Sequence, residues 1–161
     1  MRIVRVKAAD LFVLEEIESS LFDIDGFSVY ILRQYLKESV IFDKIIDPDV
    51  SKEIIGFIIM TELTKVKDKS EEDTFDGRIG HLDNIAIRRK FQSNGYGSKL
   101  LESSLSRLRK VGFTSVTLEV KQNNQQAINF YKKHGFKIVK DIGKYYASQA
   151  DAYVMKKTSL F

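Results

Sequence analysis

The sequence contains no cysteine and no tryptophan, and it has one proline and two histidines. Without cysteine the chain has no disulfide, no thiolate nucleophile and no cysteine metal site. The two histidines, His81 and His134, are too few for a histidine-rich metal cluster. We therefore expect no bound metal.

The sequence also lacks a long apolar run. No stretch reaches membrane-spanning length, and the first residues do not form the apolar region of a signal peptide. We therefore expect a cytoplasmic protein that has no membrane partner.

The composition is that of an ordinary globular domain. The 161 residues are 43% hydrophobic and 30% charged, which predicts one domain over residues 1–161 with a substantial core. The net charge of +4 would attract a phosphorylated cofactor, an acidic peptide or nucleic acid. The basic residues are spread rather than clustered, so we expect no specific nucleic-acid partner.

Hydrophobic periodicity predicts strands and helices along most of the chain. The predicted strands are residues 1–7, 40–46, 54–63, 80–87, 115–121, 136–140 and 152–156. Helices are predicted from residue 11 to about 21 and over residues 29–38, 99–110 and 124–134. Residues 66–80 are highly charged without apolar periodicity, which indicates an exposed loop or hairpin tip. Strands alternate with helices in the middle of the chain and pair near its ends, a pattern typical of a mixed α/β or α+β fold with helices on the faces of one sheet.

A glycine-containing turn, Gln92-Ser93-Asn94-Gly95-Tyr96-Gly97-Ser98, lies between the strand at 82–87 and the helix at 99–110. A helix N-terminus offers unpaired N–H groups and a positive dipole end, and both suit phosphate. Gly95 and Gly97 would let an anion approach the main chain closely. The turn lacks the Gly-Lys-Ser/Thr of a Walker loop, and Leu100 stands where the dinucleotide fingerprint has its third glycine. By itself the pattern also fits an ordinary tight turn.

The neighbouring residues carry a family resemblance. Asn84-Ile85-Ala86-Ile87, followed by Gln92-x-x-Gly95-x-Gly97, resembles the acetyl-CoA signature of the GCN5-related N-acetyltransferases (GNAT). The stretches 118–124 and 127–136, which include Asn124 and Phe130-Tyr131, resemble the second motif of that family. Lys144-Tyr145-Tyr146 and Asp151-Ala152-Tyr153-Val154-Met155 are similar to the tail of the N-terminal protein acetyltransferases, the branch with the bacterial ribosomal-protein alanine and archaeal N-α-acetyltransferases. The resemblance is close over residues 82–155 and loose before them.

The resemblance implies a fold and a co-substrate. The GNAT fold is a mixed, mostly antiparallel sheet of about seven strands flanked by about four helices. Its fourth and fifth strands are parallel and splay apart around the pantetheine arm of acetyl-CoA. The residues that match the family's cofactor motifs are Ile85, Ala86, Ile87, Gln92, Ser93, Asn94, Gly95, Tyr96, Gly97, Ser98, Asn124 and Tyr131. Asn124 would also serve as the N-cap of the following helix.

The resemblance implies three catalytic residues. Transfer of an acetyl group from a thioester to an amine needs a neutral amine, a donor for the oxyanion and a proton for the thiolate. Glu119 matches the family's general base, His81 lies where relatives carry a His or Tyr beside the amine, and Tyr131 matches the general acid for the sulfur. The pattern alone is equally typical of a solvent-facing carboxylate, a surface histidine and a core aromatic. We assign Phe130 to the core, and whether His81 or Glu119 is the main base stays open.

Phe22, His81, Tyr145 and Tyr146 would line the acceptor site by resemblance. Asp23 stands where relatives often have proline, and Gln149-Ala150 stands where they often have Gly-Glu, so the substrate preference stays open. Arg88, Arg89 and Lys90 fit a solvated basic loop as well as a site that attracts the cofactor phosphates.

The leading hypothesis for function is an N-α-acetyltransferase that uses acetyl-CoA and acts on protein N-termini, with ribosomal and nascent chains among the candidate substrates. Two alternatives remain: acetylation of a small amine (a polyamine or an amino sugar) or of a lysine side chain, and a non-catalytic acyl-CoA-binding regulatory module. The two adjacent tyrosines favour a peptide, because their rings can close over an extended chain. The presence of Glu119 and Tyr131 argues against a non-catalytic role. The sequence leaves the oligomeric state open.

Overall fold

The computed structural model describes residues 1–63 and 77–160. Its elements are β1 (Arg2–Arg5), η1 (Ala8–Asp10), α1 (Leu11–Phe22), η2 (Asp23–Asp25), α2 (Val29–Glu38), β2 (Ile41–Asp47), β3 (Ser51–Glu62), β4 (Arg78–Ile87), η3 (Arg89–Phe91), α3 (Tyr96–Lys110), β5 (Phe113–Lys121), α4 (Gln125–Lys133), β6 (Lys137–Ile142) and β7 (Ala152–Thr158). The exposed loop predicted for residues 66–80 falls mostly on residues 64–76, outside the described part, and its last residues belong to β4. None of the described helices is long and apolar enough to cross a membrane.

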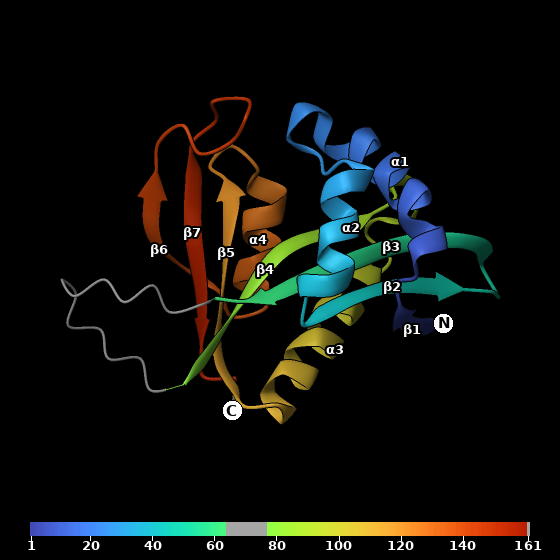
Figure 1. The fold of residues 1–161 in the computed structure, drawn as a ribbon. Helices are drawn as coiled ribbons and strands as arrows, with labels where there is room; N and C mark the ends of the chain where they lie inside the picture. The colour runs from blue at the N-terminus through green and yellow to red at the C-terminus, as the bar shows by residue number, and fades with distance from the viewer. Residues whose placement is uncertain (64–76, 161) are drawn as a thin grey trace.

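The seven strands form one mixed sheet in the order β1-β2-β3-β4-β5-β7-β6 (Figure 1). Every neighbouring pair is antiparallel except β4 and β5, which are parallel. With four α-helices packed on the sheet, this architecture confirms the predicted fold class.

The parallel strands β4 and β5 pair over only part of their length. The register runs from Arg78 opposite Phe113 to His81 opposite Thr117 and then stops, although β4 continues to Ile87 and β5 to Lys121. The two strands diverge beyond this point, as the ribbon in Figure 1 shows. From Leu82 onward the main-chain groups on the β5 side of β4 have no strand partner among residues 1–63 and 77–160, so they face the gap. The predicted splay is therefore confirmed.

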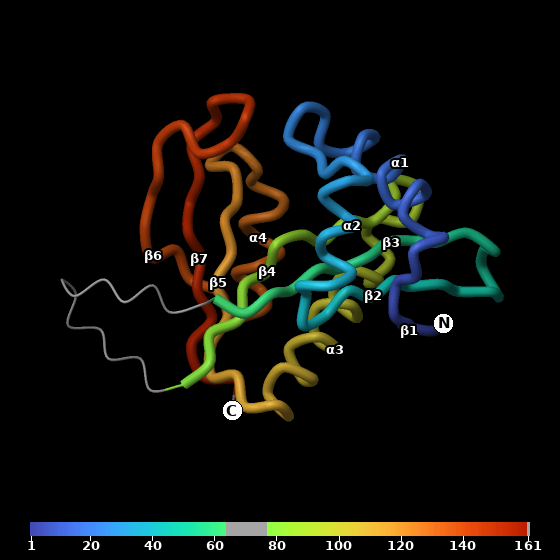
Figure 2. The backbone as a smooth tube through the Cα atoms, in the orientation of Figure 1, coloured from blue at the N-terminus to red at the C-terminus, as the bar shows by residue number. Residues whose placement is uncertain are grey.

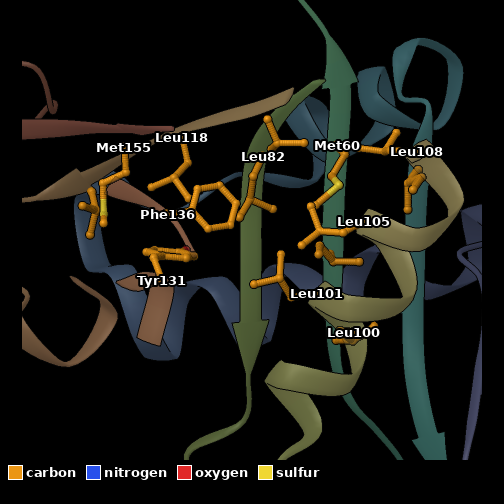
Figure 3. Packing of buried hydrophobic residues seen from close by; sticks show 14 of the residues in the cluster. Met60, Leu82, Leu100, Leu101, Leu105, Leu108, Leu118, Tyr131, Phe136 and Met155 are labelled. Atoms are coloured by element: carbon orange, nitrogen blue, oxygen red, sulfur yellow. The ribbon is translucent and has the colours of Figure 1, made fainter. Parts of the chain in front are cut away.

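Two hydrophobic clusters cover the two faces of the sheet. One joins α3 and α4 to residues such as Leu82, Leu118 and Met155 (Figure 3). The other joins α1 and α2 to residues such as Phe57 and Ala86. Strand β3 contributes to both clusters, which confirms its predicted central position with apolar residues on both faces.

Helix α3 begins at Tyr96, three residues before the predicted start at residue 99. Gly95 is its N-cap with φ = 81°, and the Lys99 N–H donates the first intrahelical bond to the Gly95 carbonyl at 3.1 Å. Tyr96, Gly97 and Ser98 thus form the first turn, whose N–H groups have no intrahelical acceptor. The predicted glycine turn is in fact a turn together with a helix start.

Candidate functional site

A cavity of about 690 Å³ is lined by the end of β4, the turn and first residues of α3, one face of α4 and the end of α1. This volume is in the usual range for a small-molecule site. Its lining includes all but one of the predicted cofactor residues, together with Phe22: Ile85, Ala86, Ile87, Gln92, Ser93, Gly95, Tyr96, Gly97, Ser98, Asn124 and Tyr131. The exception is Asn94, whose side-chain amide donates to the carbonyls of Phe91 (3.3 Å) and Gln92 (3.0 Å) and so holds the turn in shape.

The turn before α3 presents its main chain to the cavity. The Gln92 side-chain amide donates to the Ile87 carbonyl at 2.9 Å, which ties the turn to the end of β4. A β-carbon on Gly97 would lie 3.6 Å from Phe130 and 3.7 Å from Ile87, so glycine leaves room between two lining side chains. The side chain of Tyr96 is buried, and its hydroxyl donates to Asp47 at 3.1 Å. Tyr96 therefore offers the cavity mainly its main-chain N–H group.

The basic residues after β4 form ion pairs or hydrogen bonds with other residues of the chain. Arg88 pairs with Glu16 at 2.9 Å, and Lys90 pairs with Glu53 at 2.5 Å. The Arg89 guanidinium donates to the Ser20 carbonyl at 3.1 Å, and Arg89 also lines the cavity. These residues therefore attract phosphate more weakly than three unpaired cations would, since two of their charges are paired.

Helix α4 contributes cavity residues that the sequence analysis missed. Gln126, Asn129 and Lys133 line the cavity beside Phe130. Their spacing places them on one face of a helix, and this periodic signal would have identified them. Asn124 caps α4, as predicted, because its side-chain oxygen accepts the Ala127 N–H at 3.1 Å. The assignment of Phe130 to the core was incomplete, since this ring packs against the core and also lines the cavity.

Tyr131 lies between the core and the cavity. Its side chain is 9% exposed, and its ring packs edge-on against Phe130 and Phe136 (Figure 3). No hydrogen-bond partner of its hydroxyl is found in the part of the chain that the structure describes. Burial raises the pKa of Tyr131 above its ordinary value, so the hydroxyl keeps its proton and is able to donate it within the cavity.

Glu119 and His81 form a polar group on the face of the sheet that α1 and α2 cover. Val116, Leu118 and Val120 of β5 face the cluster under α3 and α4, so Glu119 points to the side covered by α1 and α2. There His81 Nε2 lies 2.7 Å from a Glu119 carboxylate oxygen.

Asp83 completes this group, and the sequence analysis did not identify it. His81 Nδ1 lies 3.2 Å from an Asp83 oxygen. Burial lowers the pKa of His81, but the hydrogen bonds to Asp83 and Glu119 outweigh it and raise the pKa to about 9. At neutral pH the group therefore holds one imidazolium between two carboxyl groups.

Tyr145 and Tyr146 lie beside Glu119. Burial, the charge of Glu119 and a hydrogen bond to it raise the pKa of Tyr145 to about 12. The two tyrosine rings meet edge to face at 5.0 Å, and Lys121 Nζ lies 5.4 Å from the centre of the Tyr146 ring. The predicted acceptor residues are therefore divided between the two regions, because Phe22 lines the cavity instead.

The predicted catalytic residues thus approach the gap from two sides: Tyr131 from the cavity, and His81 and Glu119 from the opposite face of the sheet. Among residues 1–63 and 77–160, no group of three or more His, Asp or Glu side chains is placed to hold a metal ion.

Comparison with known proteins identifies the family to which the chain is similar. The model of the acetyltransferase (GNAT) family matches residues 14–136, which is more than half of the chain. The N-alpha-acetyltransferase of Sulfurisphaera tokodaii is 35% identical over 108 residues, covering 66% of this chain and 64% of that protein. The N-alpha-acetyltransferase of Sulfolobus acidocaldarius is 40% identical over 79 residues, covering 48% of this chain and 47% of that protein. The matches span less than two thirds of the length of these relatives.

Solved structures share the whole fold. Ard1 from Thermoplasma volcanium superposes with a TM-score of 0.81 at 24% identity, covering 99% of this chain and 98% of that one. The ribosomal-protein-S18-alanine N-acetyltransferase from Escherichia coli gives a TM-score of 0.80 at 22% identity, covering 98% and 93%. At these identities the similarity establishes the fold.

Proposed function

The chain belongs to the acetyltransferase (GNAT) family, and from this premise we propose that it transfers the acetyl group of acetyl-CoA to the free N-terminal amine of proteins. The observation that carries the proposal is the two-sided site. A cavity with a free helix N-terminus and a protonated tyrosine lies on one side of the gap, and a carboxylate beside two tyrosines lies on the other. The names of the archaeal relatives support the same activity.

The cavity suits acetyl-CoA. The N–H groups of the first turn of α3 would bind its phosphates, because a helix N-terminus favours anions. Lys133 and Arg89 would add positive charge at the cavity wall. The unpaired main-chain groups of β4 beyond His81 would bind the amides of the pantetheine arm, since amides and strand edges have complementary donors and acceptors.

The remaining residues would carry the transfer. The neutral amine attacks the thioester carbonyl, forming the C–N bond, and its surplus proton passes to Glu119 directly or through a water. Main-chain N–H groups at the open edge of β4 would stabilise the oxyanion. The C–S bond then breaks, and Tyr131 gives its proton to the departing thiolate.

The two tyrosines favour a peptide acceptor over a small amine. Tyr145 and Tyr146 place two ring faces beside Glu119, which suits an extended chain better than a compact polyamine or amino sugar. The experiment is an acetylation assay over a peptide library varied at its first two residues, with polyamines and lysine side chains as control acceptors. We expect turnover of free N-termini. Turnover of the control amines alone would favour the small-amine or lysine alternative, and acetyl-CoA binding without turnover would favour the regulatory module.

Three broader statements remain predictions. They are that residues 1–161 form one domain, that the protein is cytoplasmic, and that ribosomal or nascent chains are among its candidate substrates. Limited proteolysis, localisation of a tagged chain and acetylation of ribosomal proteins, respectively, would test them.

A further inference from the structure

We propose that Asp83 is a positioning residue that holds His81 in its protonated form and directs it at Glu119, so that Glu119 rather than His81 accepts the proton of the substrate amine. The inference rests on the proposed acetyl transfer.

The position of Asp83 is set by an irregularity in the sheet. Ile59 pairs with Asn84 and Met60 pairs with Leu82, so Asp83 is an extra residue in β4 without a partner in β3. Such a bulge twists the strand and re-aims its side chains, and bulges are frequent next to active sites.

The carboxylate of Asp83 is then fixed by donors from neighbouring elements. The Tyr35 hydroxyl of α2 donates to one oxygen at 3.1 Å, and the Thr61 hydroxyl of β3 donates to the other at 2.8 Å. His81 Nδ1 lies 3.2 Å from the oxygen that Tyr35 contacts. Because only 12% of the Asp83 side chain is exposed, water competes little for these contacts.

The positions of Asp83 and Glu119 require both ring nitrogens of His81 to act as hydrogen-bond donors. One ring nitrogen faces Asp83 and the other faces Glu119 at 2.7 Å. A neutral imidazole carries one N–H and would leave one carboxylate facing a lone pair, whereas an imidazolium satisfies both. The ring therefore has no lone pair with which to accept a proton from the amine.

The other titratable groups around His81 do not change its protonation state. From α2, Tyr35 contacts Asp83, and from the segment between β6 and β7, Tyr145 contacts Glu119. Burial raises the pKa of both hydroxyls, so they act as neutral donors at physiological pH. Glu119 thus accepts hydrogen bonds from His81 and Tyr145. Because a carboxylate has about four lone-pair sites, Glu119 keeps a free lone pair that can accept the proton of the amine.

The first experiment titrates His81 by NMR in wild type and in Asp83→Asn. The chain has two histidines, so a His134→Asn variant assigns the signals. We expect His81 to titrate near pH 9 in the wild type and roughly 1–2 pH units lower in Asp83→Asn, because one opposing charge is lost. A wild-type His81 that titrates below pH 7 overturns the inference, whether or not the variant folds.

The second experiment compares kinetics at pH 7. Asp83→Asn should lower kcat by roughly tenfold with little change in the KM for acetyl-CoA, and Asp83→Glu should restore part of the loss. Tyr35→Phe is the matched control, because it removes one bond to Asp83 but no charge and should leave the His81 titration in place. If Asp83→Asn instead raises kcat/KM at neutral pH, the freed His81 is the base. A loss of activity without any shift in the His81 titration would show a purely structural role and overturn the inference.

A third comparison covers the case in which Asp83 variants are unstable. His81→Gln keeps an N–H donor near Glu119 and should lose less activity than Glu119→Gln, and the reverse order contradicts the inference. A wild type that turns over no amine overturns the proposed function, whereas the titration of His81 tests the present inference without turnover.

Discussion

Asp25 accepts two hydrogen bonds from Ser148, one from its main-chain N–H at 3.0 Å and one from its hydroxyl at 2.7 Å, although 123 positions separate the two residues. Lys121 Nζ lies 2.5 Å from the same carboxylate. These contacts join the segment between α1 and α2 to the segment between β6 and β7, which lie at the same end of the molecule in Figure 2. The segment between β6 and β7 carries Tyr145 and Tyr146, beside which we place the peptide.

Removing this connection should weaken peptide binding. We expect Asp25→Ala to raise the KM for peptide by roughly three- to tenfold, because the segments then have to be ordered by the substrate itself. The KM for acetyl-CoA should change little, since Asp25 does not line the cavity. Steady-state kinetics with each substrate varied in turn measure both values, and Asp49→Ala, in the turn between β2 and β3, is the control. Equal changes in both KM values would contradict the assignment.

The hydroxyl of Tyr131 should matter for turnover and not for folding. Tyr131→Phe keeps the ring contacts with Phe130 and Phe136, so the unfolding temperature should stay close to that of the wild type. We expect kcat to fall by roughly 10²-fold, the usual size for a general acid. Because burial holds the pKa of Tyr131 above the pH range in which activity is measured, the pH profile of the wild-type kcat should show no high-pH decrease caused by this residue. Tyr30→Phe, at a position that is 78% exposed, is the matched control.

Gly95 and Gly97 should respond differently to substitution. Gly95 has φ = 81°, and no atom of the described residues lies within 4 Å of an added β-carbon. Gly95→Ala should therefore lower the free energy of unfolding by about 1 kcal/mol through backbone strain. Gly97 is helical, and its added side chain would stand between Phe130 and Ile87 in the cavity. Gly97→Val should therefore fold but bind acetyl-CoA at least ~2 kcal/mol more weakly. Calorimetry and thermal unfolding separate the two effects, and wild-type affinity in folded Gly97→Val would remove the cofactor assignment.

Glu18 should make the stability depend on pH. Glu18 is 1% exposed, and one of its oxygens accepts the Phe27 N–H at 2.9 Å. The side chain of Asn84 is a second hydrogen-bond donor beside the carboxylate. Burial outweighs the hydrogen bonds and raises the pKa of Glu18 to about 7. The folded protein therefore holds this proton more tightly than the unfolded chain. The resulting stability is present below pH 4.5 and is lost as the pH rises through 7.

Glu18→Gln removes this titration while keeping an oxygen for the Phe27 N–H. We expect the variant to exceed the wild type in unfolding free energy by about 1–3 kcal/mol at pH 8, and by less at pH 6. Chemical denaturation of both proteins at several pH values gives this difference. Glu15→Gln is the control. Glu15 is also a carboxylate on α1 that accepts a main-chain N–H, in its case that of Val29 at 2.7 Å. A difference that does not vary with pH would contradict the role of burial.

The features that could be predicted from the sequence are those encoded locally. The alternation Val116, Leu118 and Val120 against Glu119 gave the strand and its two faces, because side chains alternate across a sheet. The order of strand, glycine turn and helix placed Gly95 and Gly97 at the cavity. The start of α3 was misplaced because Gly97, a poor helix former, lies in its first turn.

The features that could not be predicted depend on contacts between distant segments. Asp83 owes its position to a bulge and to donors from α2 and β3, 48 and 22 positions away in the sequence. The sequence left open whether Arg88 is a solvated cation or helps to attract the cofactor phosphates, and in the fold Glu16 lies beside it. No local pattern reveals such pairs, because charge pairing is set by packing.

The divergence of β4 and β5 also has a consequence for handling the protein. Two strand edges inside the sheet carry unpaired main-chain groups, and such edges can pair with other chains and promote aggregation. A ligand that fills the gap would cover both edges and raise the free energy of unfolding by about 2.7 kcal/mol at a concentration 100 times its Kd. The ligand-free protein should therefore be the form that precipitates first on warming or storage, and acetyl-CoA or CoA in the buffer should prolong its life in solution.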